Sequence, residues 1–272
     1  MKLQYQSEGD GPLVVLLHGF PESSRSWRRQ LPALARAGFR AIAPDLRGYA
    51  SSPKPKGADA YVMTDVVTDV AELIDSMSSV PVMVVGHDWG AVVAWNLAMM
   101  RPDLVRKLAI LNVPPPAAIA RELHRSKKQK VKLLYQLFFQ LPLLPELFMK
   151  LCGGLLLRFS GRFTREEIKA YRQEWRGNLT TMLNYYRAIN KSRAAMRKNQ
   201  RRIDAPTLII WGEHEPVFLA SAIENIGDWV SNARIERVAH AGHFVQTDAP
   251  EAVTRLLIDF AATPATALPP NS

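Results

Sequence analysis

The chain has 272 residues, of which 47% are hydrophobic, and it carries one cysteine and a formal charge of +10. This length and apolar fraction suit one α/β core with an insertion and exclude a largely disordered chain. The single cysteine, Cys152, excludes an internal disulfide, and we interpret it as a small buried hydrophobe. The N-terminus is too polar for a signal peptide, and no uninterrupted apolar run reaches about 20 residues. We therefore predict a soluble, cytoplasmic protein.

Short apolar runs alternate with helical patterns along most of the chain. The runs predicted as strands cover residues 13–17, 40–43, 81–85, 107–111, 207–211 and 234–238. Helical periodicity marks residues 25–37, 62–77, 90–100, 221–230 and 250–261. Near-continuous hydrophobic strands are typical of parallel sheets that are buried on both faces. The alternation predicts a mostly parallel, doubly wound α/β sheet.

The alternation stops between residues 116 and 203, where only helical patterns are found. They cover residues 130–140, 145–159, 165–176 and 179–191. We predict an all-helical cap over 116–203, inserted between two late core strands, with the core formed by 1–115 and 204–262. The tail 263–272, rich in proline and small residues, is expected to be disordered.

Positive charge is concentrated in the predicted cap. Residues 121–202 hold 20 Lys or Arg against 5 Asp or Glu, a balance of +15, so the rest of the chain carries −5. A solvated basic face is the simplest interpretation, and the alternative is weak association of the cap with an anionic membrane surface. No nucleic-acid-binding module is recognised, so we expect no nucleic-acid partner. The sequence leaves open whether the protein is a monomer or a homodimer.

The sequence GHDWG at residues 86–90 lies between a predicted strand and a predicted helix. A glycine–x–nucleophile–x–glycine turn lifts its central side chain, here Asp88, clear of its neighbours, and the helix N-terminus favours negative charge. The alternative is that Asp88 only caps the helix. A carboxylate with an ordinary pKa of ~4 is ionised at neutral pH and attacks sp³ carbon to form an ester. Asp88 as nucleophile therefore predicts epoxides or alkyl halides as substrates.

A histidine and an acid follow the nucleophile in the chain. His243, in AGHF at residues 241–244, is the candidate general base, because the order nucleophile, acid, base is the one usually found with this type of turn. The candidate acid is Glu215, after the strand 207–211, and Glu213 is the second choice. The other position for this acid, after the strand ending at Leu111, holds the uncharged Asn112.

The loop HGFP at residues 18–21 follows the first clear strand. In this arrangement such a loop supplies one backbone amide to an oxyanion hole, and the residue after the nucleophile supplies another. The candidate amides are those of Phe20 and Trp89.

Together these residues resemble the epoxide hydrolases of the α/β-hydrolase family over nearly the whole chain. The matching segments are HGFPE at 18–22 with Trp27, GHDWGA at 86–91, NVP at 112–114 and GHFVQ at 242–246. The resemblance implies an α/β-hydrolase fold and two cap tyrosines that bind and protonate the epoxide oxygen. Tyr135 and Tyr186 match these tyrosines, with Tyr185 as the fallback. Phenol donors suit this role because ring opening creates an alkoxide.

Three features depart from the family pattern. The family usually has Asp where this chain has Glu215, and the longer side chain is expected to shift His243 or to slow the second half-reaction. Pro115 and Pro116 stand where an NVPHP-like sequence is common, which is expected to change entry into the cap. There is room for one strand before Leu13, where the family normally has two.

The sequence thus predicts an epoxide hydrolase that opens a small lipophilic epoxide to a vicinal diol. An ester on Asp88 would be hydrolysed by water that His243 and Glu215 activate, and no metal or organic cofactor is implied. The side chains expected to contact substrate are His18, Pro21, Trp27, His87, Phe138, Phe139 and Phe244. One alternative is a haloalkane dehalogenase, although Phe20 occupies a place where a halide-binding Asn can sit. The other is a non-catalytic ligand-binding protein that has kept the fold.

Overall fold

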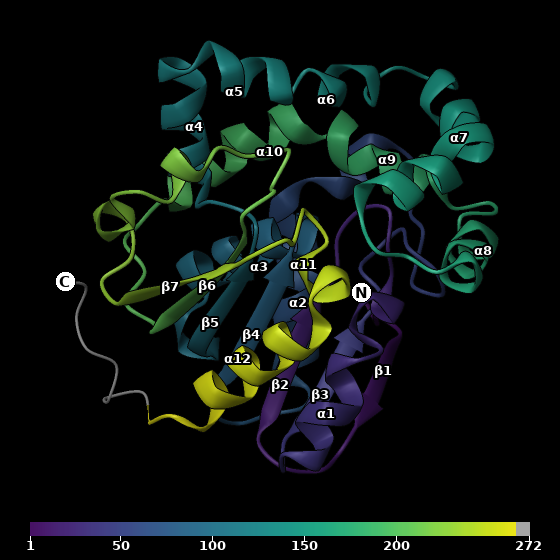
Figure 1. The fold of residues 1–272 in the computed structure, drawn as a ribbon. Helices are drawn as coiled ribbons and strands as arrows, with labels where there is room; N and C mark the ends of the chain where they lie inside the picture. The colour runs from purple at the N-terminus through teal and green to yellow at the C-terminus, as the bar shows by residue number, and fades with distance from the viewer. Residues whose placement is uncertain (265–272) are drawn as a thin grey trace.

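A computed structural model describes residues 1–264, which form one sheet with helices on both faces and a helical layer above it (Figure 1). The strands are β1 (Tyr5–Glu8), β2 (Leu13–Leu17), β3 (Arg40–Pro44), β4 (Val82–His87), β5 (Val105–Leu111), β6 (Thr207–Gly212) and β7 (Ala233–Val238). The helices outside the layer are α1 (Gln30–Arg36), α2 (Met63–Asp75), α3 (Trp89–Met100), α11 (Val245–Asp248) and α12 (Pro250–Ala262).

The seven strands of residues 1–264 have the order β1-β3-β2-β4-β5-β6-β7. All neighbouring strands are parallel except β1, which runs antiparallel to β3 at the sheet edge. β2 to β6 are buried along nearly their whole length, which accounts for their continuous apolar sequences. The predicted fold class is confirmed. One strand precedes Leu13 here, and it pairs with β3 rather than forming a hairpin with β2.

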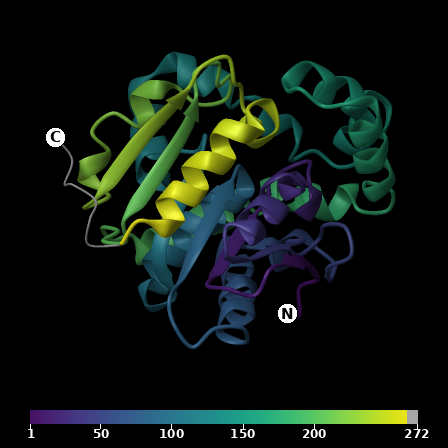
Figure 2. The same cartoon turned by 60° about the horizontal axis from the view of Figure 1, so that its bottom comes forward.

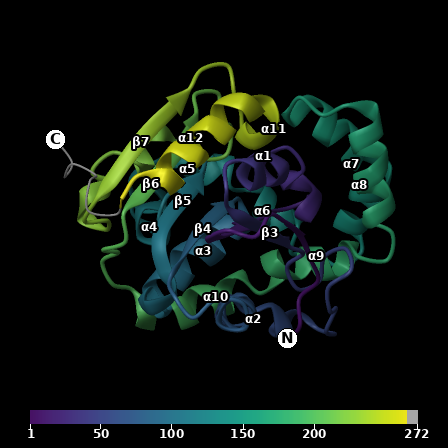
Figure 3. The same ribbon diagram turned by 90° about the horizontal axis from the view of Figure 1, so that it is seen from below.

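Helices cover both faces of the sheet. Seen from below, α1 and α12 lie on one face, and α2 and α3 on the other (Figure 3). The yellow helix α12 runs diagonally across its face (Figure 2). Each face has its own hydrophobic core, and the core around α2 and α3 continues into the helical layer above the sheet. That continuity fixes the helical layer over one end of the sheet.

The helical layer, called the cap below, lies between β5 and β6 in the chain. Its helices are α4 (Pro116–Arg125), α5 (Lys127–Lys132), α6 (Tyr135–Phe138), α7 (Leu144–Ser160), α8 (Arg165–Glu174), α9 (Leu179–Arg187) and α10 (Ile189–Met196). The predicted helices 130–140 and 179–191 are each divided in two, at Leu133 and at Ala188. The cap covers the carboxyl ends of the strands (Figure 1), where side chains from different strands meet.

Two predictions of helices outside the cap were wrong. The segment 25–37 is a 3₁₀ helix at Ser24–Trp27 followed by α1, because Pro32 lacks the N–H that an unbroken helix would bond to the carbonyl of Arg28. The segment 221–230 contains only short 3₁₀ turns, at Ala220–Ala222 and Ile226–Asp228. Asn225 between them has φ of 57°, in the left-handed region that ends a right-handed helix. Further 3₁₀ turns are Ala58–Tyr61, Pro102–Leu104 and Arg197–Asn199.

The structure also bears on three smaller expectations. Cys152, on α7, is half-buried rather than buried. Of the tail predicted to be disordered, Thr263 closes α12 through its amide, and residues 265–272 lie outside the described part of the chain. Among the helices of residues 1–264, none combines the length and the apolar character needed to cross a bilayer.

Candidate active site

Asp88 occupies a tight turn between β4 and α3. Its backbone has φ of 51° and ψ of −120°, and its side chain makes no capping bond to the helix. The interpretation of Asp88 as a plain helix cap was therefore wrong. The turn needs glycine at its contacts, since a Cβ on Gly90 would lie 2.2 Å from the carbonyl oxygen of Leu17. A Cβ on Gly19 would lie 2.3 Å from the Cβ of Asp88, so glycine there lets the two loops meet.

The two oxygens of Asp88 have different partners. Oδ1 accepts a hydrogen bond of 2.7 Å from the Phe20 amide, and Oδ2 lies 3.5 Å from Nε2 of His243. Burial raises the pKa of Asp88, but the hydrogen bond and charge of His243, together with the Phe20 amide, outweigh it and hold the pKa below its ordinary value. Asp88 is thus ionised and held in place by one amide. The Trp89 amide follows directly as the first residue of α3, where helix amides have no helical acceptor.

Glu215 contacts the ring nitrogen of His243 that is remote from Asp88. Its Oε2 lies 2.7 Å from Nδ1 of His243, and its Oε1 accepts the amides of Val217 at 2.5 Å and Phe218 at 3.3 Å. Glu213, the second choice for this acid, is exposed. Burial lowers the pKa of His243, but the carboxylates of Glu215 and Asp88 outweigh burial and raise the pKa to about 10. A protonated imidazole between two carboxylates is the resting arrangement that this geometry favours.

Two buried side chains, Asn112 and His87, hold the backbone of the His243 loop. The Nδ2 of Asn112 donates to the carbonyls of Gly242 at 2.7 Å and His243 at 2.8 Å, while its Oδ1 accepts the amide of Gly212 at 2.7 Å. The ring of His87 bonds the His243 carbonyl at 2.8 Å. Asn112, considered from sequence only as an unsuitable acid, therefore ties β5 to β6 and to the histidine loop. Its motif match was the one signal in the sequence for this role.

A second set of buried hydrogen bonds is centred on Glu22, and it was not predicted from the sequence. Glu22 is 1% exposed. It accepts hydrogen bonds from Ser26 at 2.8 Å, Gln246 at 3.0 Å and the Tyr171 hydroxyl at 3.0 Å. Gln246 also bonds Nδ1 of His87 at 3.1 Å. The network links the loop after β2 to the histidine loop and to α8 of the cap, so a buried carboxylate positions all three.

A cavity of about 510 Å³ separates Asp88 from the cap. Asp88, Trp89, Tyr135 and Tyr186 line it, and the rest of the wall is mainly apolar. That apolar wall includes Val92, Val113, Ile119, Leu123, Leu133, Ile189, Met196 and Phe218. The cavity therefore presents one carboxylate and two phenols among mainly apolar side chains. Its other polar lining residues are His124, Gln136, Arg193, Arg197 and Gln200.

Of the candidate cap tyrosines, Tyr135 and Tyr186 lie together, with ring centroids 6.2 Å apart. The ring of Tyr186 also packs against Trp89 at 5.1 Å. Tyr185 points away from the cavity and donates a hydrogen bond from its hydroxyl to the Arg47 carbonyl. Tyr185, the alternative to Tyr186, is therefore not among the residues that line the cavity. Burial and the nearby Asp88 carboxylate raise the pKa of Tyr135 and Tyr186, so both phenols keep their protons at neutral pH.

The side chains expected to contact substrate lie mostly behind the wall of the cavity. Trp27 was placed wrongly: it is fully buried in the core on the α1 and α12 face. His18 is also fully buried, and its Nε2 accepts the Leu46 amide at 3.1 Å. The carbonyl of Pro21 accepts the indole N–H of Trp175 at 2.7 Å, which fixes the loop to the cap.

The aromatic candidates divide between the two sides of the site. Phe139 packs on Tyr186 at 5.0 Å and so supports the roof, while Phe138 contacts Phe139 at 5.7 Å. Phe244 packs on His243 at 5.3 Å, and His87 lies 4.9 Å from His243 by ring centroids. These side chains support the tyrosines and the histidine rather than line the cavity in the part of the chain that the structure describes. Within residues 1–264 no group of His, Cys, Asp and Glu is arranged to hold a metal ion.

Comparison with known proteins identifies the family of the chain. The family described as alpha/beta hydrolase fold matches residues 12–250. The chain belongs to the α/β-hydrolase family. This match covers the core on both sides of the cap together with the cap itself, and it agrees with the sheet order and the nucleophile turn.

Among individual members of the α/β-hydrolase family, the chain is 35% identical to the AB hydrolase superfamily protein YfhM of Bacillus subtilis, over 92% of this chain and 90% of that protein. It is 32% identical to Epoxide hydrolase 3 of Xenopus tropicalis, over 96% of this chain and 74% of that protein. The crystal structure of the Bacillus megaterium epoxide hydrolase with an inhibitor has a TM-score of 0.86 at 30% identity, covering 96% of this chain and 97% of that one. The resemblance to epoxide hydrolases found in the sequence motifs is confirmed.

Proposed function

We propose that this α/β-hydrolase opens a lipophilic epoxide with water to give a vicinal diol. The observation that carries the proposal is the position of one ionised carboxylate, Asp88, across a mainly apolar cavity from two protonated tyrosines. The named relatives of the chain, among them the epoxide hydrolases of Xenopus tropicalis and Bacillus megaterium, support the same reaction.

In the first half-reaction, Oδ2 of Asp88 attacks one ring carbon of the epoxide. Oδ1 already accepts the Phe20 amide, which leaves Oδ2, 3.5 Å from Nε2 of His243, as the attacking oxygen. The C–O bond of the ring breaks, and its electron pair forms an alkoxide on the other carbon. Tyr135 and Tyr186 hold that oxygen by hydrogen bonds, and one phenol gives it a proton. The product of this step is an ester between Asp88 and a hydroxyalkyl group.

In the second half-reaction, His243 takes a proton from water, and the hydroxide attacks the ester carbonyl carbon of Asp88. The negative charge develops on the oxygen that the Phe20 amide already holds, and the Trp89 amide is the second donor. The ester C–O bond then breaks, the leaving alkoxide takes the proton of the carboxylic acid formed on Asp88, and the diol and the Asp88 carboxylate result. One oxygen of the regenerated carboxylate comes from water.

The charges of Asp88 and Glu215 explain why His243 acts as a base only after the ester has formed. Before the reaction, Asp88 and Glu215 together keep the proton on His243. Ester formation removes the charge of Asp88, so the pKa of His243 falls from about 10. The imidazolium then gives its proton to the phenolate that the first step leaves, and the neutral imidazole can act as a base. Glu215 remains to stabilise the imidazolium that forms when water is deprotonated.

The test is the variant His243→Gln incubated with styrene oxide and analysed by mass spectrometry. We expect the ester to accumulate on the peptide that contains Asp88, because the first half-reaction does not need the base. The control is His214→Gln, which changes an exposed histidine and should turn over without an adduct. A His243→Gln protein that is folded and carries no adduct on Asp88 would overturn the proposed mechanism.

A parallel assay with a bromoalkane separates this function from haloalkane dehalogenation. Both reactions use a carboxylate nucleophile, but only epoxide opening needs two phenol donors. Release of bromide without diol formation from styrene oxide would reverse the assignment, and turnover of neither compound would favour the non-catalytic alternative.

A further inference from the structure

Helix α7, Leu144–Ser160, has apolar residues on two opposite faces. One face packs inward through Met149, Gly153 and Leu157, which are spaced by one helical turn. The opposite face also repeats at helical spacing but lies in water. We call this face the apolar stripe; it consists of Leu144, Leu147, Phe148, Leu151, Leu155 and Phe159.

The exposure of the apolar stripe is high for side chains of this size. Phe159 is 84% exposed, Leu151 is 65% exposed and Leu155 is 56% exposed. Further exposed leucines extend this surface from α7 along the turn that leads back to α6. They are Leu134, Leu137, Leu141 and Leu143. Scattered apolar side chains are ordinary on a protein surface, but a continuous row is typical of an interaction site.

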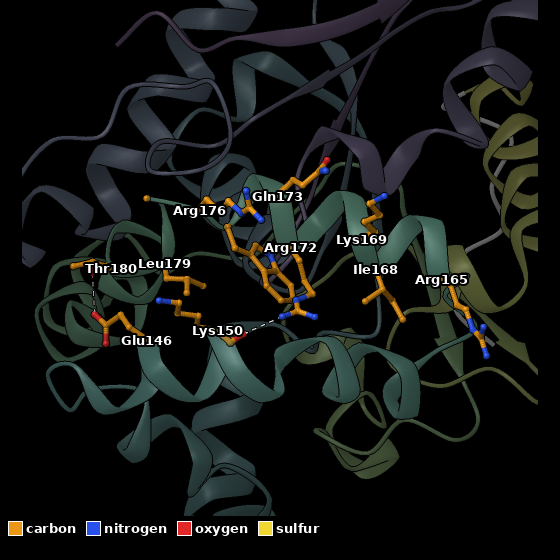
Figure 4. A pocket seen from close by; sticks show the side chains of 12 residues that line it. Glu146, Lys150, Arg165, Ile168, Lys169, Arg172, Gln173, Arg176, Leu179 and Thr180 are labelled. Atoms are coloured by element: carbon orange, nitrogen blue, oxygen red, sulfur yellow. Dashed lines mark hydrogen bonds between the residues drawn. The ribbon is translucent and has the colours of Figure 1, made fainter.

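A basic groove of about 960 Å³ lies beside the stripe, between α7 and α8 (Figure 4). Its cations follow the spacing of one helix face, and we call them the basic ridge: Arg165, Lys169, Arg172 and Arg176. Lys150 of α7 faces the ridge across the groove, close enough for its carbonyl to accept a hydrogen bond from Arg172 at 3.3 Å.

The positive charge of the groove is not neutralised within the protein. Among residues 1–264, an acidic side chain within ion-pair distance is lacking for all five cations of the groove, which are Lys150, Arg165, Lys169, Arg172 and Arg176. The single acid that lines the groove, Glu146, is paired with Arg187 at 2.8 Å. Five cations therefore face solvent with no counter-charge of their own.

We propose that α7 and α8 form a docking surface for a lipid bilayer that contains anionic lipids. The acyl region accepts the apolar stripe, and the anionic headgroups occupy the basic groove and surround the ridge. Interfacial helices bind membranes by this combination of an apolar face and flanking cations, and the charge excess of +15 over residues 121–202 draws the cap to a negative surface.

Other occupants fit fewer of these features. A small soluble anion would fill the groove but leave the row of leucines in water. A second copy of this chain, placed by twofold symmetry, would bring each basic ridge against the same surface of its partner, where like charges repel. A bilayer with anionic lipids offers apolar area and negative charge side by side.

The docking surface adjoins the proposed site of reaction. Leu134 and Leu137 face outward from the short helix α6 and its start, while Tyr135 and Gln136 of the same segment line the cavity over Asp88. A lipophilic epoxide dissolved in the bilayer would thus be held one helix away from the cavity. That consequence rests on the proposed function, whereas the binding of lipid does not.

The experiment is co-sedimentation with vesicles, without substrate. Vesicles of phosphatidylcholine with about one third phosphatidylglycerol are compared with pure phosphatidylcholine vesicles at low and high salt. We expect the protein to sediment with the anionic vesicles at low salt, and to be released by high salt, because screening weakens attraction to the headgroups. An absence of sedimentation with anionic vesicles at low salt would overturn the proposal.

Two sets of variants locate the surface. Replacing Arg165, Lys169 and Arg176 by Gln is expected to weaken binding on the order of 100-fold, since each cation near an anionic surface contributes roughly fivefold. The matched control replaces three exposed cations outside the cap by Gln, namely Lys2, Arg36 and Lys56. The control should bind within about threefold of the parent protein, and equal loss in the two triple variants would refute the location.

The second set replaces Leu147, Leu151 and Leu155 by Ser and is expected to abolish sedimentation. Circular dichroism and thermal unfolding are measured for every variant, and unchanged spectra and Tm show that the fold is intact. Sedimentation velocity supplies the remaining outcome. A dimer that the serine variant dissociates, with no binding to vesicles, would identify the stripe as a contact between copies and would overturn the proposal.

Discussion

Replacing Glu215 by glutamine removes the negative charge behind the candidate base while keeping the length of the side chain. The carboxylate accepts at both ends, from Nδ1 of His243 on one side and from the amides of Val217 and Phe218 on the other. A glutamine side chain accepts at one end only, so one of these contacts must fail. A hydrogen bond to a charged group contributes about 1.5–3 kcal/mol. Its loss should slow ester hydrolysis roughly 10- to 150-fold, at about 1.4 kcal/mol for each factor of ten.

The assay is a single-turnover reaction with styrene oxide in which ester formation and ester hydrolysis are followed separately. The Glu215→Gln change should act mainly on hydrolysis, so the ester accumulates before the diol appears. Glu213→Gln is the matched control, because it removes the same charge from an exposed carboxylate in the same loop. It should leave both steps within about twofold of the parent rates, as surface charges usually do.

The pH dependence gives an independent check of the sign. Glu215 raises the pKa of His243, so its loss lowers that pKa, and the imidazole of the variant stays neutral at lower pH. The ratio of parent to variant hydrolysis rates should therefore be smallest in acid and grow as the pH rises. A ratio that falls with pH, or a Glu213→Gln variant as slow as Glu215→Gln, would refute the assignment of Glu215.

Changes at the tyrosines, at Asn112 and at Gly90 test other parts of the site. Tyr135→Phe and Tyr186→Phe should each slow ester formation roughly 10- to 100-fold in the same single-turnover assay, whereas Tyr185→Phe should not, because its hydroxyl bonds a backbone carbonyl. Asn112→Leu removes three buried hydrogen bonds, and calorimetry should show a fall in Tm of about 5–15 °C; an unchanged Tm would contradict its structural role. Gly90→Ala places a methyl 2.2 Å from a backbone oxygen and should yield little folded protein, so normal expression and activity would contradict the packing.

Features set by short segments were predictable from the sequence. The nucleophile turn needs only a buried strand, glycines at fixed spacing and a helix, and all of these lie within residues 82–100. The order of strands and helices followed from periodicity in the same way. Where local chemistry opposed periodicity, the prediction failed, as at Pro32 and Asn225, because a single backbone restriction ends a helix whatever its apolar pattern.

Features that depend on the approach of distant segments were not predictable. Trp27 belongs to a motif match, but only the fold shows that its ring faces the core beside α12 instead of the cavity. Glu22 bonds Tyr171 and Gln246, which lie 149 and 224 positions further along the chain. No spacing in one sequence links such residues, and a glutamate after a loop is ordinarily exposed.

The glutamate at position 215 shows how such distant and local effects combine. The sequence predicts that a side chain longer than the usual Asp shifts the imidazole, yet Oε2 lies 2.7 Å from Nδ1 of His243, an ordinary distance for a charged hydrogen bond. The extra methylene is accommodated because Oε1 is anchored to the amides of Val217 and Phe218, so the turn after β6 fixes the carboxylate from the other side. The position of the acid is therefore set by the turn and the side chain together. Its effect on the rate of the second half-reaction remains a prediction that the Glu215 variants measure.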